Sequence, residues 1–185
     1  MSRPGWLVSI AVSTLLLGGC SGDEPSASPP SEPPSTTSAA SPPTPTPPSP
    51  PASARKPNKA GAVAFAHHYI DLVNFASRTG DLVTLREASA ASCRSCQNII
   101  EILDSVYGRG GRVEGGHWTV RSYSAVAAGP KATWLVAMNL RADSQVVRSG
   151  ATAAPEERGG GDFSASLYAK RSVDAWQVKR LVRDQ

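Results

Sequence analysis

Two of the chain's three cysteines lie in the stretch Ser92-Cys93-Arg94-Ser95-Cys96, a spacing shared by redox-active dithiols and by halves of zinc sites. A thioredoxin-like dithiol follows a strand of a parallel sheet, whereas a short helix and an Ala/Ser segment are predicted before this pair. A structural zinc site needs four ligands, and the chain offers no second such pair and only the histidines His67, His68 and His117. We therefore expect neither a metal nor another cofactor.

The third cysteine, Cys20, follows a segment typical of bacterial export. Arg3 precedes an apolar run at residues 6–17, which is too short to cross a bilayer as a helix of about 20 residues. The run ends in Leu17-Gly18-Gly19-Cys20, which resembles the lipobox of bacterial lipoproteins, where cleavage before the cysteine leaves its thiol to carry the lipid. We therefore expect a signal peptide at 1–19, lipidation of Cys20 and anchoring at the outer face of the bacterial cytoplasmic membrane.

Assigning Cys20 to the lipid leaves Cys93 and Cys96 as the one remaining pair. Exported proteins fold in an oxidising compartment, where paired thiols persist as disulfides. Cys96 also falls on the apolar side of a predicted helix, which would shield it from reaction partners. We therefore predict a structural disulfide between Cys93 and Cys96; a thiol–disulfide oxidoreductase is the alternative.

The composition of the chain changes at about Pro57. Residues 20–57 are rich in Pro, Ser and Thr and contain no aromatic or large aliphatic residue, so we expect a disordered tether there. Residues 58–185 contain every Phe and Tyr of the chain and are long enough for one hydrophobic core. The net charge of +4 is mild and suits an anionic wall polymer at a cell surface, whereas we expect no nucleic acid partner for an exported chain.

Helices come first in this domain and strands follow. Helical spacing of apolar residues predicts helices over 61–77, 82–88 and from an N-cap at Ser92 to Tyr107. Gly80 is expected to end the first helix and Asp81 to cap the second. Glycine-rich loops are expected at 108–116 and 149–162. Alternating residues predict strands over 118–127, 133–141, 163–171 and 176–182. This order predicts an α+β domain in which three helices pack on a curved antiparallel sheet of about four to five strands.

A set of residues in this domain resembles an uncharacterised family of actinobacterial lipoproteins. The resemblance is carried, in order, by Asn74, Gly80-Asp81, Cys93 with Cys96, and Gly115-Gly116-His117-Trp118, behind a lipobox and a Pro/Thr-rich spacer. The order of helices and strands, together with Trp176 and Val178 near the end, is also similar to the nuclear transport factor 2-like cone. The family implies the fold and the membrane address, and no activity.

We find no nucleophile elbow, no zinc-protease helix and no phosphate-binding loop, and we assign no catalytic residue. The expected function is therefore binding of an envelope protein or a small ligand, without catalysis. Cones of this kind often enclose a pocket between sheet and helices, and the residues expected to line it here are Tyr69, Val73, Trp118 and Trp134. The alternative is an enzyme that uses this pocket, with Asp71 or His117 as its base.

Overall fold

The computed structural model describes residues 44–129 and 133–184. The predicted signal peptide at 1–19, Cys20 and the first part of the predicted tether lie outside the described residues, so these predictions stay predictions. Within the described residues, no helix combines the length and the apolar character needed to cross a membrane.

Three helices form the first half of the domain, as predicted. Helix α1 spans Lys59–Thr79 and begins at Asn58, whose side chain accepts a hydrogen bond from the Gly61 N–H. It ends at Gly80, which adopts the left-handed conformation (φ 75°) that glycine enters without strain. Helix α2 spans Val83–Ala88 and is preceded by a turn in which the Asp81 carboxylate accepts from the Val83 N–H.

Helix α3 spans Arg94–Gly108, and its N-cap differs from the predicted one. The cap is Cys93 rather than Ser92, because the Cys93 sulfur lies 3.4 Å from the Cys96 nitrogen and accepts its hydrogen bond. The apolar stripe of α3 buries Cys96, Ile100, Leu103 and Val106. The pair of closely spaced cysteines therefore builds the first turn of this helix.

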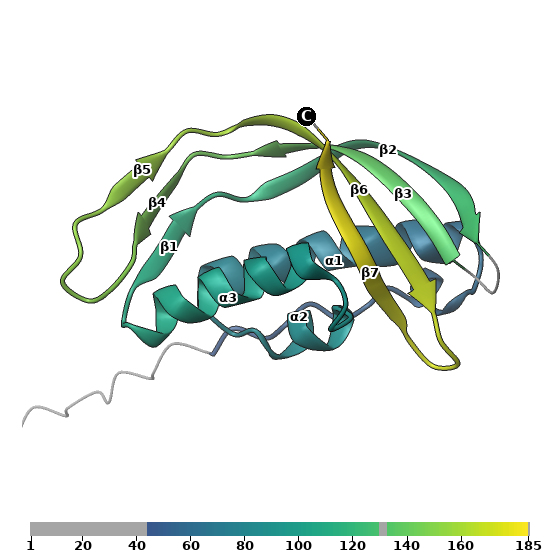
Figure 1. The fold of residues 1–185 in the computed structure, drawn as a ribbon, viewed down its shortest axis with the longest axis horizontal. Coiled ribbons are helices and arrows are strands. Elements are labelled where there is room, and N and C mark those ends of the chain that lie inside the picture. The colour runs from purple at the N-terminus through teal and green to yellow at the C-terminus, as the bar shows by residue number, and fades with distance from the viewer. Residues whose placement is uncertain (1–43, 130–132, 185) are drawn as a thin grey trace, which may run out of the picture. The chain divides into compact units, whose positions relative to one another are not determined.

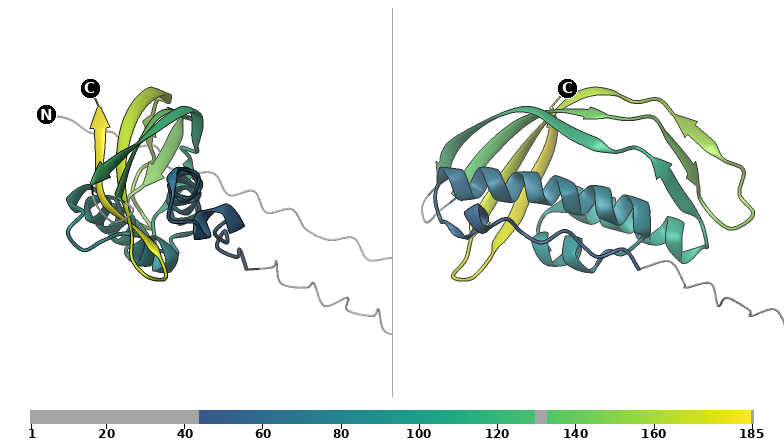
Figure 2. Two further views of the ribbon diagram at one scale, coloured as in Figure 1. Left: turned by 90° about the vertical axis from the view of Figure 1, so that its right-hand side faces the viewer. Right: turned by 180° about the vertical axis from the view of Figure 1, so that it is seen from behind.

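The four strands predicted from alternation form one antiparallel sheet in the order β2-β3-β6-β7. They are β2 (Trp118–Gly129), β3 (Thr133–Ala142), β6 (Gly161–Arg171) and β7 (Trp176–Asp184). Alternation holds in β3, where Val136, Met138 and Leu140 are buried and Asn139 and Arg141 are exposed. The sheet arches over the helices, and α1 runs along its length beside β2 (Figures 1 and 2).

Three short strands were not predicted. They are β1 (Arg112–Gly115), β4 (Gln145–Arg148) and β5 (Glu156–Arg158), and they pair in the order β1-β4-β5. Each is separated by only two residues from a strand of the larger sheet, so that β1, β4 and β5 continue β2, β3 and β6 beyond a bend (Figure 1). The segments 108–116 and 149–162, predicted as loops, therefore contain strands. The described residues form seven strands, more than the four or five predicted.

The core fills the space between the arch and the helices. Its largest fully buried side chains come from α1, α2, α3 and the inner face of the sheet, and include Tyr69, Ile70, Leu72, Leu85, Ile100, Met138, Leu140 and Leu167. The α+β cone predicted from the sequence is thus confirmed.

The end of the predicted tether is packed on the domain. We call residues 44–55 the strap. It ends in a 3₁₀ turn, η1 (Ala52–Arg55), where Ala54 is buried and its carbonyl accepts a 2.7 Å hydrogen bond from Trp176 Nε1. A Cβ on Gly61 would lie 1.8 Å from the Lys56 oxygen, so the backbone before α1 packs directly against the first turn of this helix. Ala54 and Lys56, which belong to the segment predicted as a disordered tether, thus contact the domain.

Candidate functional site

Some of the family-like residues, namely Asn74, Gly116 and Trp118, come together at the bend of the sheet, and their contacts are structural. Asn74 on α1 holds the free edge of β2 at its first residue. Its Oδ1 accepts from the Trp118 N–H at 2.8 Å, and its Nδ2 donates to the Trp118 carbonyl at 2.9 Å. The Asn74 side chain thus supplies the hydrogen bonds that a neighbouring strand would otherwise make to this edge of the sheet. Gly116 lies at the same bend with a φ of 70°, and its N–H donates to the Ser144 carbonyl.

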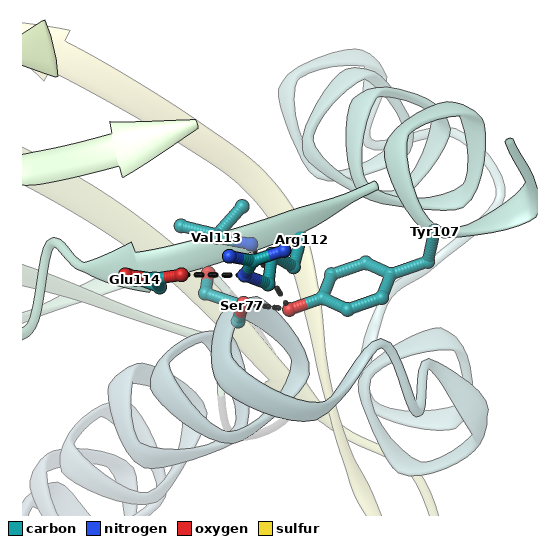
Figure 3. A network of polar contacts seen from close by, with 5 residues as sticks. All are labelled: Ser77, Tyr107, Arg112, Val113 and Glu114. Carbon is teal, nitrogen blue, oxygen red and sulfur yellow. Dashed lines mark hydrogen bonds and ion pairs between the residues drawn. The ribbon is translucent and has the colours of Figure 1, made fainter. Parts of the chain in front are cut away.

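Tyr107 joins the end of α3 to the end of α1 and to β1 (Figure 3). Its hydroxyl donates a 2.6 Å hydrogen bond to the Ser77 carbonyl, one of the carbonyls that the last turn of a helix leaves unpaired. The Val113 N–H donates to the same hydroxyl at 3.4 Å. Burial raises the pKa of Tyr107, against opposing effects of the Val113 hydrogen bond and the Arg78 charge. The side chain is thus held as a neutral, bridging phenol, while Arg112 and Glu114 pair beside it.

Cys93 and Cys96 form the predicted disulfide. Both residues are almost fully buried, with 1% and 0% of their surface exposed. Thiol exchange requires attack on a sulfur atom by an incoming thiolate, and burial denies that approach. The structure thus supports a structural disulfide. It argues against the oxidoreductase alternative, which requires a sulfur atom that an incoming thiolate can reach.

The four residues predicted to line a pocket inside the cone do not do so together. Tyr69 and Val73 are buried in the core, and the Tyr69 hydroxyl is hydrogen-bonded to Ser89 Oγ at 2.9 Å. Burial raises the pKa of Tyr69 to about 12, although the Ser89 hydrogen bond acts in the opposite direction. Trp134 packs against the core at its edge. Trp118 lines a hollow at the bend of the sheet, where its ring meets Phe163 at a centroid distance of 5.1 Å.

Asp71 and His117, the bases of the enzyme alternative, lie outside the cone. Both are exposed, and both line a shallow groove with Asn74, Arg78 and the strap residue Pro48. Within the described residues, no hydrogen bond or ion pair joins Asp71 to His117. In the same part of the chain, no group of three or more His, Cys, Asp or Glu residues is placed to hold a metal.

A second hollow, mostly apolar, lies where the strap crosses the domain, and we call it the strap pocket. It encloses about 280 Å³, close to the lower limit of about 300 Å³ for small-molecule sites. Its walls come from the strap, one face of α1, α2 and the turn between β6 and β7. The lining residues are Pro48, Pro50, Pro51, Ala54, Arg55, Phe65, His68, Leu72, Thr84, Glu87, Ala88, Arg171, Asp174, Ala175 and Trp176.

One polar side chain of this lining, that of His68, is buried, and the hydroxyl oxygen of Thr84 is inaccessible to water although the residue is partly exposed. His68 on α1 is 7% exposed, and burial lowers its pKa below the usual 6.5 even though the Asp71 carboxylate opposes the shift. The imidazole is therefore neutral at pH 7. Thr84 on α2 has a buried hydroxyl oxygen that forms no hydrogen bond within the described residues. Mostly apolar walls are typical of ligand sites.

Comparison with known proteins places the chain in a family. Residues 33–181 match the family described as "Family of unknown function (DUF6318)". The chain belongs to this family. None of the curated proteins matches it in sequence.

Three solved structures are similar to this member of DUF6318 at low sequence identity. The intermembrane space region of the chloroplast protein ARC6 has a TM-score of 0.51 and 12% identity, covering 68% of this chain and 95% of that one. An uncharacterised protein with a cystatin-like fold from Caulobacter vibrioides has a TM-score of 0.43 and 11% identity, covering 68% and 91%. The protein Aln2 from a Streptomyces species has a TM-score of 0.44 and 11% identity, covering 70% and 94%. At such identities the likeness to ARC6 concerns the fold alone.

Sequence reasoning missed the strap pocket. Thr84 and Ala88 belong to the predicted second helix, and Trp176 belongs to a predicted strand. The sequence therefore predicted these elements, but it did not predict that they lie side by side. The prolines of the strap carry no periodicity that would indicate packing. One local signal is Gly61, a glycine in the first turn of a helix, where an added Cβ would lie 1.8 Å from the Lys56 oxygen.

Proposed function

We propose that this DUF6318 member is a lipoprotein, anchored through Cys20 at the outer face of a bacterial cytoplasmic membrane, whose domain binds a small and mainly apolar ligand in the strap pocket. The observation that carries the binding part is the pocket itself, a mostly apolar hollow whose lining includes the buried His68 imidazole. The lipobox-like sequence before Cys20 carries the anchoring part.

The interior of the cone is the less suitable site. Tyr69, one of the residues predicted to line it, is 0% exposed and already hydrogen-bonded, and the core around it is filled by side chains of the helices and the sheet. The strap pocket, by contrast, is bounded by the segment that leads to the proposed anchor. Binding there would therefore take place at the junction of tether and domain.

The anchoring part predicts that Cys20 carries fatty acid. Cells that express the full chain are fed an alkyne-labelled palmitate, and the purified protein is examined for the label. We expect labelling of the wild type and of a Cys93→Ala/Cys96→Ala variant, and complete loss of labelling in Cys20→Ala. Label retained in Cys20→Ala would contradict the proposed lipid anchor.

The binding part predicts that filling the pocket abolishes uptake of an apolar probe. The uncharged dye N-phenyl-1-naphthylamine, which fluoresces in apolar surroundings, is titrated into the full chain. Ala88 lines the pocket, so Ala88→Phe should weaken dye binding at least about tenfold, the loss expected when a ring occupies the space of the ligand.

The matched control is Ala91→Phe. Ala91 lies three residues further along the chain, is exposed and is not among the lining residues, so the same side chain is added without entering the pocket. We expect this variant to bind the dye like the wild type, with unfolding curves showing that all three proteins are folded. Equal binding by Ala88→Phe and Ala91→Phe, or no binding by the wild type, would refute the proposal.

A further inference from the structure

His68 is the buried polar side chain of the strap pocket. It lies on α1 between Phe65 and Leu72, which come three residues before and four residues after it and line the same pocket. Residues at this spacing share one face of a helix, so the three side chains point the same way. Only 7% of His68 is exposed. Of the hollows described above, the strap pocket alone is lined by His68, so a ligand in this pocket would lie against the imidazole.

The imidazole has no hydrogen-bond partner within the described part of the chain. In the same part, the water-inaccessible side-chain atoms without a partner are Thr84 Oγ1 and Arg148 Nε. The ring nitrogens of His68 are not among them, so both nitrogens can be reached by water or by a ligand. Buried polar side chains are normally hydrogen-bonded, and a neutral imidazole offers one donor and one acceptor. These two positions are open to a molecule in the pocket.

The charges around His68 disfavour an anion as the bound molecule. On α1, the Asp71 carboxylate is close enough to act on the imidazole, and it would repel an anion bound there. The other charged residues of the lining come from the strap, α2, β6 and the turn after β6, and they balance in sign: Arg55, Glu87, Arg171 and Asp174. All of them except Arg171 are exposed. An anion would therefore lose its water without gaining an excess of positive charge.

We infer that the ligand of the strap pocket is an uncharged apolar compound carrying a hydroxyl group that hydrogen-bonds to the His68 imidazole. This inference rests on the proposed function, because it names the class of ligand for the same site. A hydroxyl both donates and accepts, so it suits either nitrogen of a neutral ring. The apolar body packs on Leu72, on the strap prolines and on Phe65, whose ring stacks with that of Trp176 at a centroid distance of 5.9 Å.

Three naphthalenes of similar size test this class of ligand. The full chain is titrated with 2-naphthol, 2-methylnaphthalene and 2-naphthoate at pH 7.5, which represent a neutral ligand with a hydroxyl, a neutral ligand without one and an anion. We expect 2-naphthol to bind about fivefold more tightly than either of the others, the discrimination of one additional buried hydrogen bond.

His68→Leu removes the hydrogen-bonding ring and keeps an apolar side chain in its place. Because the ring has no partner among the described residues, this variant should unfold at the same temperature as the wild type or higher. We expect it to bind 2-methylnaphthalene at least as well as the wild type does, and to prefer 2-naphthol by less than about twofold. His68→Gln, which keeps a donor and an acceptor, should retain the preference. The matched control is His67→Leu on the same helix, outside the pocket lining, which should behave like the wild type.

The pH dependence of binding gives a second measurement, which a merely structural His68 would not change. Burial lowers the pKa of His68 below the usual 6.5, against the opposing effect of the Asp71 carboxylate. An apolar ligand covers the ring and binds its neutral form, so binding is strongest above this pKa and weakens as the pH falls through it. For 2-naphthol, which is uncharged throughout, we expect at least about twofold weaker binding at pH 5 than at pH 7.5 in the wild type and in His67→Leu. His68→Leu and His68→Gln should lose this dependence.

The outcomes separate this inference from the proposed function. The inference would be overturned by a His68→Leu variant that keeps the full preference for 2-naphthol, by 2-naphthoate binding as tightly as 2-naphthol, or by wild-type affinity for 2-naphthol that does not fall at pH 5. Each of these results would leave the pocket as a binding site. Failure of all three compounds to bind the wild type would instead overturn the proposed function, and the inference with it.

Discussion

Replacing Asn74 with alanine should lower the free energy of unfolding by about 2–4 kcal/mol, the cost of leaving two partly buried backbone groups without partners. Both ends of the Asn74 amide are bonded to the same residue, Trp118, at 2.8 and 2.9 Å. Trp118 opens β2, the edge strand of the larger sheet, so no neighbouring strand of that sheet can take over these bonds. Their loss exposes the edge at the point where the sheet bends.

Urea unfolding followed by circular dichroism measures this change, and Asn139→Ala is the matched control. Asn139 also forms two side-chain hydrogen bonds, but it is exposed and bonds only the hydroxyls of Ser122 and Ser164 on the outer face. Water can replace both partners, so we expect a loss of no more than about 0.5 kcal/mol. Similar losses in the two variants would show that the Asn74 clamp contributes no more than surface hydrogen bonds.

The elements that follow strong periodicity were predictable from the sequence. One face of α3 and one face of β3 are buried. Apolar residues therefore recur at helical spacing in α3 and at every second position in β3, and both patterns can be recognised in the sequence. The disulfide was predictable for a different reason, because Cys93 and Cys96 lie close enough in sequence to pair without any knowledge of the fold.

The second sheet left no such pattern. Its strands span only three or four residues, and only Val113 and Val147 of the strand residues are buried. Segments such as Arg112–Gly115 and Glu156–Arg158 are mainly polar and lie beside glycines, as loops do. They become strands because they continue the pairing of longer neighbours beyond the bend, which is a property of the assembled sheet.

The candidate site was the least predictable part, for a related reason. A pocket depends on which side chains fail to fill a space, and Tyr69 fills the space in which a pocket was expected. The strap pocket arises where chain segments more than 120 residues apart meet, as the hydrogen bond from Trp176 to Ala54 shows (a separation of 122 residues). Local composition, which favoured disorder for the strap, contains no information about such a meeting.

Three of the residues that resemble a family motif have structural roles in the scaffold. Asn74 holds the edge of β2, Gly116 forms the bend itself, and Gly80 makes room for Tyr107. None of these three lines the strap pocket. A motif that maintains the scaffold can thus be shared by proteins whose ligands differ, and the ligand must be sought in residues outside the motif.

Because Gly80 has this packing role, Gly80→Ala should also have a large effect, a loss of about 2–5 kcal/mol in the free energy of unfolding. Two costs combine. The φ of 75° places an alanine in a left-handed conformation that costs about 1–2 kcal/mol, and the added Cβ would lie 2.5 Å from the Tyr107 ring. Moving that ring would also break the hydrogen bond from Tyr107 to the Ser77 carbonyl, which closes the last turn of α1.

Gly108→Ala and Gly80→Asn separate the two costs. Gly108 ends α3, and a Cβ there meets no atom within 4 Å, so alanine should be neutral or stabilise by up to about 1 kcal/mol. Asparagine tolerates the left-handed conformation but still places a Cβ against Tyr107, so Gly80→Asn should recover only the conformational part of the loss. Full recovery in Gly80→Asn would mean that the close approach of Tyr107 contributes nothing. A Gly80→Ala variant as stable as Gly108→Ala would contradict both costs, and with them the packing role of Gly80.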